Sequence, residues 1–240
     1  LRGKGMACSV YAAAPYLLGL YRAGFGADAT AMIADRRTTH SWAYMLAQNA
    51  GGTMEAWDVA RKPNTTYSHP WSASPVFLLA EGLMGVRPLE PGYRRFTVAL
   101  QPGRVRSARL TLPPPAGNIE VAYRCVEYRM EIDVTVPSRT RAVVAVPQWD
   151  VVSLPGGAGS GAFPEGYGDA AARGKDSPRA LTVAVDGRPA RCEPWADPDG
   201  PSDRSAAPAA PGLKLARSLA PGRHRVVVSV VVPRSACGAR

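Results

Sequence analysis

The sequence predicts an α+β chain with two domains, a helical one over residues 1–90 and an antiparallel β-sandwich over residues 91–240. Apolar side chains recur at helical spacing between residues 5 and 37, which is typical of helices that bury one face. After Pro91 the apolar repeat shortens to two residues, the repeat of a half-buried strand. A chain of 240 residues, 46% of them hydrophobic, is long enough to bury the cores of one or two such domains.

The helical part should begin with two helices joined by a short turn. Gly24 and Gly26 interrupt the first pattern, and the run ADATAMIADRR then resumes it. One side of the first helix gathers four apolar or aromatic residues: Tyr16, Leu17, Leu20 and Tyr21. These residues predict a buried helix, with a signal peptide as the minor alternative, because Pro15 and polar residues interrupt the segment.

Two further helices are expected before the strands begin. The first is SWAYMLAQNA, which Thr38 or Thr39 can cap and which Gly51 and Gly52 end. Its buried face should hold Trp42, Met45 and Leu46. The second covers about SASPVFLLAEGLMG, with a core of Phe77, Leu78, Leu79 and Leu83.

The β part is read from short apolar runs between Pro- and Gly-rich turns. The clearest run is VEYRMEIDVTV, which should place six apolar or aromatic residues on one face and five polar ones on the other. The apolar face is Val126, Tyr128, Met130, Ile132, Val134 and Val136, and the polar face is Glu127, Arg129, Glu131, Asp133 and Thr135. Further strands are expected at FTVAL, ARLTL, IEVAYR, RAVVAV, LTVAVDG, LKLAR and RVVVSVVV, with Asp186 and Gly187 in a hairpin turn. Low-complexity loops are expected near residues 153–179 and 193–212, which are poor in apolar residues.

Composition excludes several classes of function. The formal net charge of +10 comes mostly from scattered arginines without interleaved aromatic residues, so nucleic acid is not a predicted partner. A basic face for nucleic acid or an anionic polysaccharide is the alternative. No apolar run reaches the roughly 18 residues that a membrane helix requires. The four cysteines lack metal-binding spacing, so no metal is expected; free thiols are the default, and a Cys192–Cys237 disulfide is the alternative.

Residues 51–75, GGTMEAWDVARKPNTTYSHPWSASP, concentrate the side chains that carbohydrate sites use. Glu55 stands between Met54 and Trp57, whose apolar side chains could tune a carboxylate for proton transfer. His69 offers one donor and one acceptor to a pair of hydroxyls, and Trp71 offers an aromatic face. Each has an alternative: a structural glutamate, a structural histidine, and tryptophans that belong to the core.

Three blocks in this order carry a resemblance to a known family: HSWAYMLAQNAGGTMEAWD, KPNTTYSHPWSASP and GLMGVRPLEPGYRRFTVALQP. They resemble the end of the catalytic barrel in inverting α-L-rhamnosidases, glycoside hydrolase family 78. The runs LTLPPPAGNIEVAYR and MEIDVTVPSRTRAVVAVP are similar to the family's C-terminal β-domain. The resemblance thus implies a multidomain fragment, in which the last helices of an (α/α)6 barrel precede the sandwich.

The resemblance also implies roles for single residues. The family's general base falls on Glu55, in a loop between helices that should line the barrel cavity, and His69 is similar to a histidine expected to bind sugar hydroxyls. Trp57 and Trp71 should stack on the sugar or support the rim of the site. Met54 stands where the family often has a tryptophan, so this subsite should differ in shape from that of the family.

Inverting glycosidases need a second carboxylic acid about 6.5–9.5 Å from the base. Asp35, Asp58 and Glu90 stand in no motif that resembles the family's acid, so we expect that acid upstream of Leu1. The chain should therefore be inactive alone, although it derives from an enzyme that removes terminal α-L-rhamnose without a cofactor. A non-catalytic carbohydrate-binding module and a truncated pseudoenzyme are the alternatives. The resemblance implies secretion, but no signal is visible, and the oligomeric state is not predicted.

Overall fold

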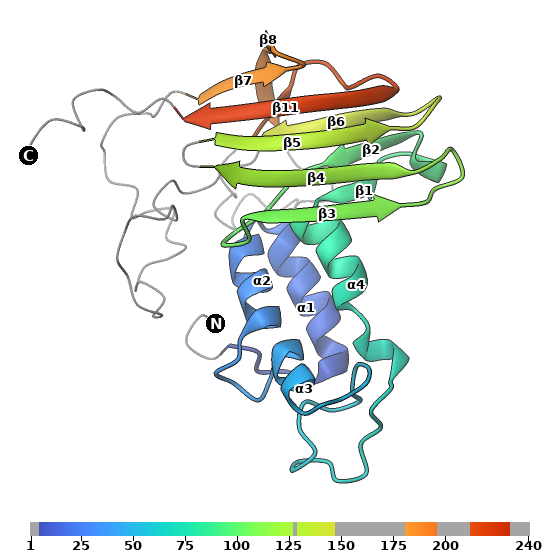
Figure 1. Ribbon diagram of the computed structural model, residues 1–240. Helices are drawn as coiled ribbons and strands as arrows, with labels where there is room; N and C mark the ends of the chain where they lie inside the picture. The colour runs from blue at the N-terminus through green and yellow to red at the C-terminus, as the bar shows by residue number, and fades with distance from the viewer. Residues whose placement is uncertain (1–4, 127–128, 147–180, 196–211, 231–240) are drawn as a thin grey trace, which may run out of the picture.

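Helices build the N-terminal part of the molecule and two stacked sheets build the rest, as a computed structural model shows for residues 5–126, 129–146, 181–195 and 212–230 (Figure 1). The helical elements are α1 (Val10–Arg22), α2 (Gly26–Ala34), α3 (Trp42–Ala47), the 3₁₀ turn η1 (Pro70–Ser72), α4 (Pro75–Leu78), the π-helical turn η2 (Leu79–Leu83) and a second 3₁₀ turn, η3 (Pro91–Tyr93). The mixed α+β class is confirmed.

The first two helices form as predicted. Ser9 caps α1, because its side chain accepts a hydrogen bond from the backbone N–H of Ala12 at 3.2 Å. Gly24, with φ of 82°, lies in the turn between the helices, and a 2.7 Å hydrogen bond between the Tyr21 and Thr30 hydroxyls then joins them. The buried face of α1 consists of Val10, Ala13, Leu17 and Tyr21.

The later helices are shorter than predicted. Ser41, and not Thr38 or Thr39, caps α3 by accepting from the N–H of Tyr44 at 3.0 Å. Trp42 and Met45 are buried, but Leu46 is 73% exposed, because so short a helix buries only a narrow stripe.

The predicted helix at SASPVFLLAEGLMG is formed by α4 and η2, which follow each other directly, while its first residue, Ser72, ends η1. Pro75 stands at the start of α4. Leu78 and Leu83 are buried as expected, whereas Phe77 is 40% exposed.

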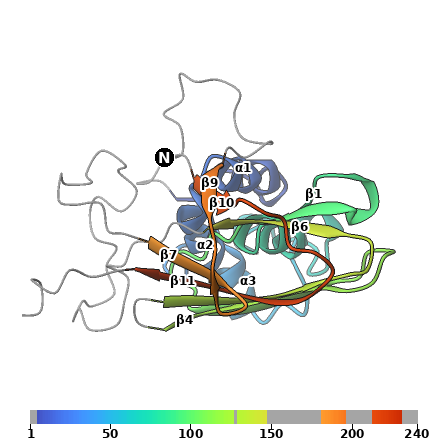
Figure 2. The same ribbon diagram turned by 90° about the horizontal axis from the view of Figure 1, so that it is seen from above.

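The strands form two sheets that lie face to face (Figure 2). One has the order β1-β2-β6-β10-β9 and the other β3-β4-β5-β11-β7-β8. Their bounds are β1 (Val86–Pro88), β2 (Arg95–Val98), β3 (Ser107–Leu112), β4 (Ile119–Val126), β5 (Arg129–Val136), β6 (Arg141–Val146), β7 (Leu181–Val185), β8 (Arg188–Pro189), β9 (Cys192–Trp195), β10 (Gly212–Leu215) and β11 (Gly222–Val230).

One strand pair departs from the predicted antiparallel arrangement. β2 and β6 are parallel, with Arg95 opposite Arg141, while the other pairs among the described strands are antiparallel. The chain leaves β2, builds β3, β4 and β5 in the second sheet, and returns as β6. Parallel neighbours require such a long crossover, and the alternation of residues within each strand does not reveal it.

The core between the sheets continues into the helical part. Phe96, Ile132 and Val144 are buried in this core. Buried and exposed residues alternate at the start of β4, whereas β6 is buried at every position from Ala142 to Val146. At the junction, the Gln101 side chain accepts from the N–H of Gly26 at 3.1 Å and donates to the carbonyl of Tyr21 at 2.9 Å. These bonds fix the sheets to α1 and α2.

The run VEYRMEIDVTV is not one strand. Val126 ends β4 and lies opposite Arg129 at the start of β5, so the chain reverses within the run; Val126 is 43% exposed. Met130, Ile132, Val134 and Val136 are buried as predicted, and Tyr128 lies outside the described residues. Glu131, predicted on the wet face, is buried because two arginines cover it.

The predicted hairpin at Asp186 and Gly187 is confirmed, since both residues have positive φ, 50° and 77°, and join β7 to β8. The loop predicted near residues 153–179 lies outside the described residues. Of the loop predicted near residues 193–212, residues 193–195 belong to β9 and Gly212 begins β10. Cys8, Cys125 and Cys192 carry free thiols, and Cys237 lies outside the described residues.

Candidate active site

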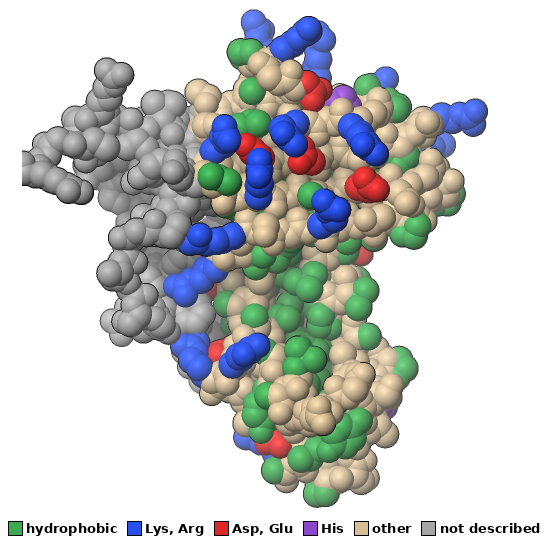
Figure 3. Space-filling view, viewed as in Figure 1, with side chains coloured by type: hydrophobic (Ala, Val, Ile, Leu, Met, Phe, Trp, Pro, Cys, Tyr) green, Lys and Arg blue, Asp and Glu red, His purple; other side chains and the backbone are tan. Residues whose placement is uncertain are grey.

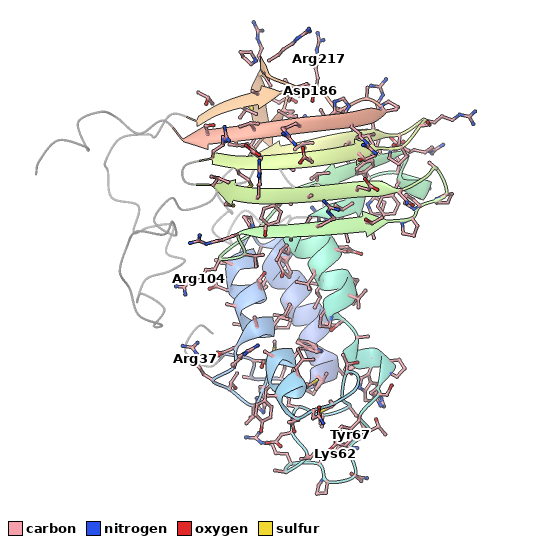
Figure 4. All side chains as sticks on the ribbon, in the orientation of Figure 1. Arg37, Lys62, Tyr67, Arg104, Asp186 and Arg217 are labelled. Carbon is pink, nitrogen blue, oxygen red and sulfur yellow. The ribbon has the colours of Figure 1, made fainter. Side chains whose placement is uncertain are left out.

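Residues 48–72, called the site loop below, form the end of the helical part that lies farthest from the sheets. Figure 4 shows Lys62 and Tyr67 at this end, while Asp186 lies at the opposite end of the molecule. The loop begins where α3 ends at Gln48, and Asn49 follows with a left-handed φ of 57°. Glu55 therefore follows a helix C-terminus, as the sequence predicts.

Two legs of the site loop are held side by side by hydrogen bonds. The N–H of Glu55 donates to the carbonyl of Thr66 at 3.0 Å, and the N–H of His69 donates to the carbonyl of Thr53 at 2.7 Å. The N–H of Ala56 donates to the buried hydroxyl of Thr65 at 3.1 Å. These bonds place Glu55 and His69, which are distant in sequence, on neighbouring legs.

Glu55 is held as a carboxylate by a lysine. Its Oε2 lies 2.8 Å from Lys62 Nζ and accepts a longer bond, 3.4 Å, from the N–H of Thr66; its side chain is 20% exposed. The hydrogen bond from Lys62 is the main cause that lowers the pKa of Glu55 below its ordinary value, and the charge of His69 acts in the same direction. A general base must be ionised, and this environment favours that form.

The apolar neighbours act differently from the prediction. Met54 is fully buried and Trp57 is 5% exposed, so both side chains belong to the core while Glu55 reaches the surface. The electrostatic partner of Glu55 is a cation seven positions along the chain, which local sequence patterns do not indicate.

His69 is half-buried and is oriented by two neighbours. Its Nδ1 lies 2.7 Å from the hydroxyl of Thr66, and its ring centroid lies 4.2 Å from that of Trp71. Nε2 has no hydrogen-bond partner among the residues that the structure describes. The imidazole can therefore use Nε2 for a ligand.

The two tryptophans of the predicted site have different environments. Trp71 is 48% exposed, and its ring lies 5.4 Å from that of Tyr11, an exposed residue of α1 that sequence reasoning missed. Tyr11 could have been noticed as an aromatic residue outside the buried stripe of its helix. Trp57 is buried, donates its indole N–H to the carbonyl of Cys8 at 2.7 Å, and contacts Trp42 edge to face at 4.9 Å. Burial favours the packing role for Trp57.

The other acids considered from sequence are engaged elsewhere. Asp35 binds Arg37, Asp58 caps its own turn at the N–H of Ala60, and Glu90 lies beside Arg94 and Arg95. The helical part also contains Asp28 and Glu81, which sequence reasoning passed over.

Within the described part of the chain, no group of three metal-ligating side chains comes together. No helix there combines the length and apolar character that crossing a membrane demands.

Comparisons with known proteins place this chain beside one family. Residues 85–159 match the family model described as the bacterial α-L-rhamnosidase C-terminal domain. A search of curated proteins gave no match. The resemblance predicted from the sequence is confirmed by this match together with the fold of two solved structures.

The first of these structures is the α-L-rhamnosidase of Dictyoglumus thermophilum, with a TM-score of 0.57 and 16% identity over 84% of this chain. The second is that of Streptomyces avermitilis complexed with L-rhamnose, with a TM-score of 0.57 and 19% identity over 88% of this chain. The match covers only 18% and 17% of those two chains, so this chain spans less than a fifth of either.

Proposed function

We propose that this chain, whose residues 85–159 match the family model of the bacterial α-L-rhamnosidase C-terminal domain, forms the C-terminal part of an inverting α-L-rhamnosidase. In this proposal residues 1–90 end an (α/α)6 catalytic barrel and residues 91–240 form the β-domain. The complete enzyme would remove terminal α-L-rhamnose from glycosides or polysaccharides.

The exposed apolar surface of the helical part supports the proposal that further barrel helices pack against it. Hydrophobic side chains gather over the helices in Figure 3, whereas charged ones cover the sheet. Large apolar side chains exposed in this part are Tyr11, Phe25, Leu46, Tyr67, Trp71, Val76 and Phe77. So much exposed apolar surface is unusual for a free monomer and suits further helices of a barrel.

Glu55 is the proposed general base. It would take a proton from water while the oxygen of that water bonds to the anomeric carbon of rhamnose and the glycosidic C–O bond breaks. The leaving oxygen would take its proton from a carboxylic acid on another loop of the barrel. The ion pair with Lys62 supports this role, because it lowers the pKa of Glu55 and so favours the ionised form that a base requires.

His69 and Trp71 are the proposed sugar contacts. Nε2 of His69 would bind a hydroxyl of rhamnose, and the exposed face of Trp71 would pack on the apolar side of the ring. Trp57 would support the site from within the core, where its indole N–H donates to the carbonyl of Cys8. The observation that carries the proposal is the closed site loop, which brings an ionised glutamate, an imidazole and an exposed indole together.

The stereochemistry of the product tests the mechanism. In the complete enzyme, ¹H NMR of a freshly started reaction with an aryl α-L-rhamnoside should show β-L-rhamnose first, and Glu55→Gln should lower kcat by about 10²–10⁴-fold. First-formed α-L-rhamnose, or full activity of the Glu55→Gln variant, would contradict the proposal.

A non-catalytic sugar-binding module is the second candidate. The observation in its favour is that no second carboxylate is among the partners of Glu55 within the described residues. Calorimetric titration of the 240-residue chain with L-rhamnose, together with an assay of the complete protein, separates the two. Binding without turnover in the complete protein would favour the module, and absence of both would favour a truncated pseudoenzyme.

A further inference from the structure

The segment between the two legs of the site loop carries Lys62 back to Glu55. Asp58 starts a turn in which its carbonyl accepts from the N–H groups of Arg61 and Lys62, at 3.2 and 3.3 Å. The carboxylate of Asp58 also binds the N–H of Ala60 at 3.0 Å. Beyond the turn, the N–H of Thr65 donates to the carbonyl of Lys62 at 2.9 Å. The backbone of Lys62 is thus bonded on both sides.

Both bonds to the Glu55 carboxylate converge on the same oxygen. Lys62 Nζ lies 2.8 Å from Oε2, and the N–H of Thr66 lies 3.4 Å from that same atom. Oε1 has no hydrogen-bond partner among the residues described by the structure. One oxygen is therefore anchored, and the other is left to accept a proton.

Thr66 joins the two functional side chains. Its carbonyl accepts from the N–H of Glu55 at 3.0 Å, its N–H donates to Glu55 Oε2, and its hydroxyl lies 2.7 Å from His69 Nδ1. A bond at Nδ1 restricts the orientation of the imidazole ring and so the direction in which Nε2 points. A substitution of Thr66 should therefore change the orientation of the His69 imidazole.

We propose that Lys62 and Thr66 are positioning residues of the reaction: they anchor Oε2 of Glu55 so that Oε1 receives the proton of the attacking water, and Thr66 orients His69 toward the sugar. This inference rests on the proposed function. Within the described residues, the charged or titratable groups that act on Glu55 are Lys62 and His69. Neither residue needs to touch the substrate for this role.

Kinetics of three variants test the roles. In the complete enzyme, Lys62→Met should lower kcat about ten- to a hundredfold, because a misplaced group loses a large part of its rate. It should also shift the acid limb of the pH–rate profile upward and leave KM nearly unchanged. Lys62→Arg, which keeps the charge, should restore the acid limb. Thr66→Val keeps the backbone N–H but loses the hydroxyl, so it should raise KM about tenfold, the loss of a good hydrogen bond.

The control is Lys214→Met, since Lys214 pairs with Glu193 in the β part. Lys214→Met should keep the kcat, the KM and the pH–rate profile of the parent enzyme. An unchanged acid limb and kcat in Lys62→Met would overturn the role of Lys62, and an unchanged KM in Thr66→Val would overturn that of Thr66.

A second measurement separates this inference from the proposed function. ¹³C NMR of the Glu55 carboxyl group in the complete protein should show its pKa rising when Lys62 is replaced by Met, but not by Arg. If the pKa rises while Glu55→Gln retains full activity in the complete enzyme, the ion pair is real and the proposed function is wrong. If the pKa does not change, the positioning role of Lys62 is wrong whatever the activity.

Discussion

Two glutamates of this chain, Glu55 in the site loop and Glu131 in β5, are bound by basic side chains. Among the described residues, both carboxylate oxygens of Glu131 have partners, whereas Oε1 of Glu55 has none. Glu131 lies opposite Arg124 in the antiparallel ladder; Arg124 binds its Oε2 at 2.5 Å and Arg129 binds its Oε1 at 2.5 Å. Its side chain is 7% exposed, against 20% for Glu55. The pKa of each is lowered by a basic neighbour, Arg124 or Lys62.

The comparison teaches that a low pKa alone does not identify a catalytic carboxylate. Glu131 has both oxygens occupied and lies on regular strands, which suits a structural role. Glu55 has one occupied oxygen and lies on an irregular loop beside His69 and Trp71. Loops held by a scaffold carry chemistry more often than regular strands do.

The largest expected effect breaks the comparison directly. Glu55→Gln should reduce kcat by about 10²–10⁴-fold and leave the melting temperature unchanged, because the proposed base is lost and the loop bonds made by its backbone remain. Glu131→Gln should lower the melting temperature and leave kcat unchanged, since it leaves two arginines without their carboxylate. Assays and thermal melts of both variants check this. A loss of kcat in Glu131→Gln with unchanged stability would contradict the contrast.

The two tryptophans extend the contrast within the site loop. Trp57→Ala should cost about 3–5 kcal/mol of unfolding free energy, because a buried indole leaves a cavity. Trp71→Ala should change stability little and raise KM, since its ring is 48% exposed. Urea unfolding and substrate titration measure the two effects. Equal destabilisation by both substitutions would remove Trp71 from the proposed sugar contacts.

The pH dependence of stability sharpens the comparison. The folded pKa of Glu131 lies below its unfolded value of about 4.3, so its contribution is complete above that pH and is lost as pH falls through the folded pKa. The difference in unfolding free energy between the parent and Glu131→Gln should therefore shrink below about pH 4. Glu55→Gln, on an exposed loop, should show a smaller difference throughout. A difference for Glu131→Gln that did not shrink at all as the pH fell would show that its charge is not the cause.

The smallest effect concerns the backbone of the two regions. Gly187 turns the β7–β8 hairpin with φ of 77°, so Gly187→Ala should cost about 1 kcal/mol. Gly51, in the site loop, has no left-handed φ and open space where a Cβ would stand, so Gly51→Ala is the matched control and should be tolerated. Chemical denaturation of both variants measures the difference. Equal costs would mean that the hairpin geometry is not what constrains Gly187.

The sequence predicted most of the strands and little of the site's geometry. Alternation identified the buried residues Met130, Ile132 and Val134, because a two-residue repeat is a local property. The reversal at Val126, the parallel pairing of β2 with β6 and the burial of Glu131 depend on partners that local patterns do not specify.

The same limit applies to the site loop. The sequence predicted Glu55 and His69 as functional residues, a prediction that awaits the experiments above. It did not indicate Lys62, Thr66 or Tyr11, because closure of the loop and packing on α1 bring them into place. The sequence kept two roles open for Trp57, and only its burial and its bond to Cys8 favour one of them.

Chemical rescue tests the central claim, that Glu55 is the general base, most directly. The measurement is the hydrolysis of an aryl α-L-rhamnoside by the complete enzyme with Glu55→Ala, with and without azide. The account predicts a loss of about 10²–10⁴-fold that azide restores, with formation of β-L-rhamnosyl azide, because the anion needs no base to attack. Full activity of the variant, or a loss that azide does not restore and that accompanies a lower melting temperature, would contradict it.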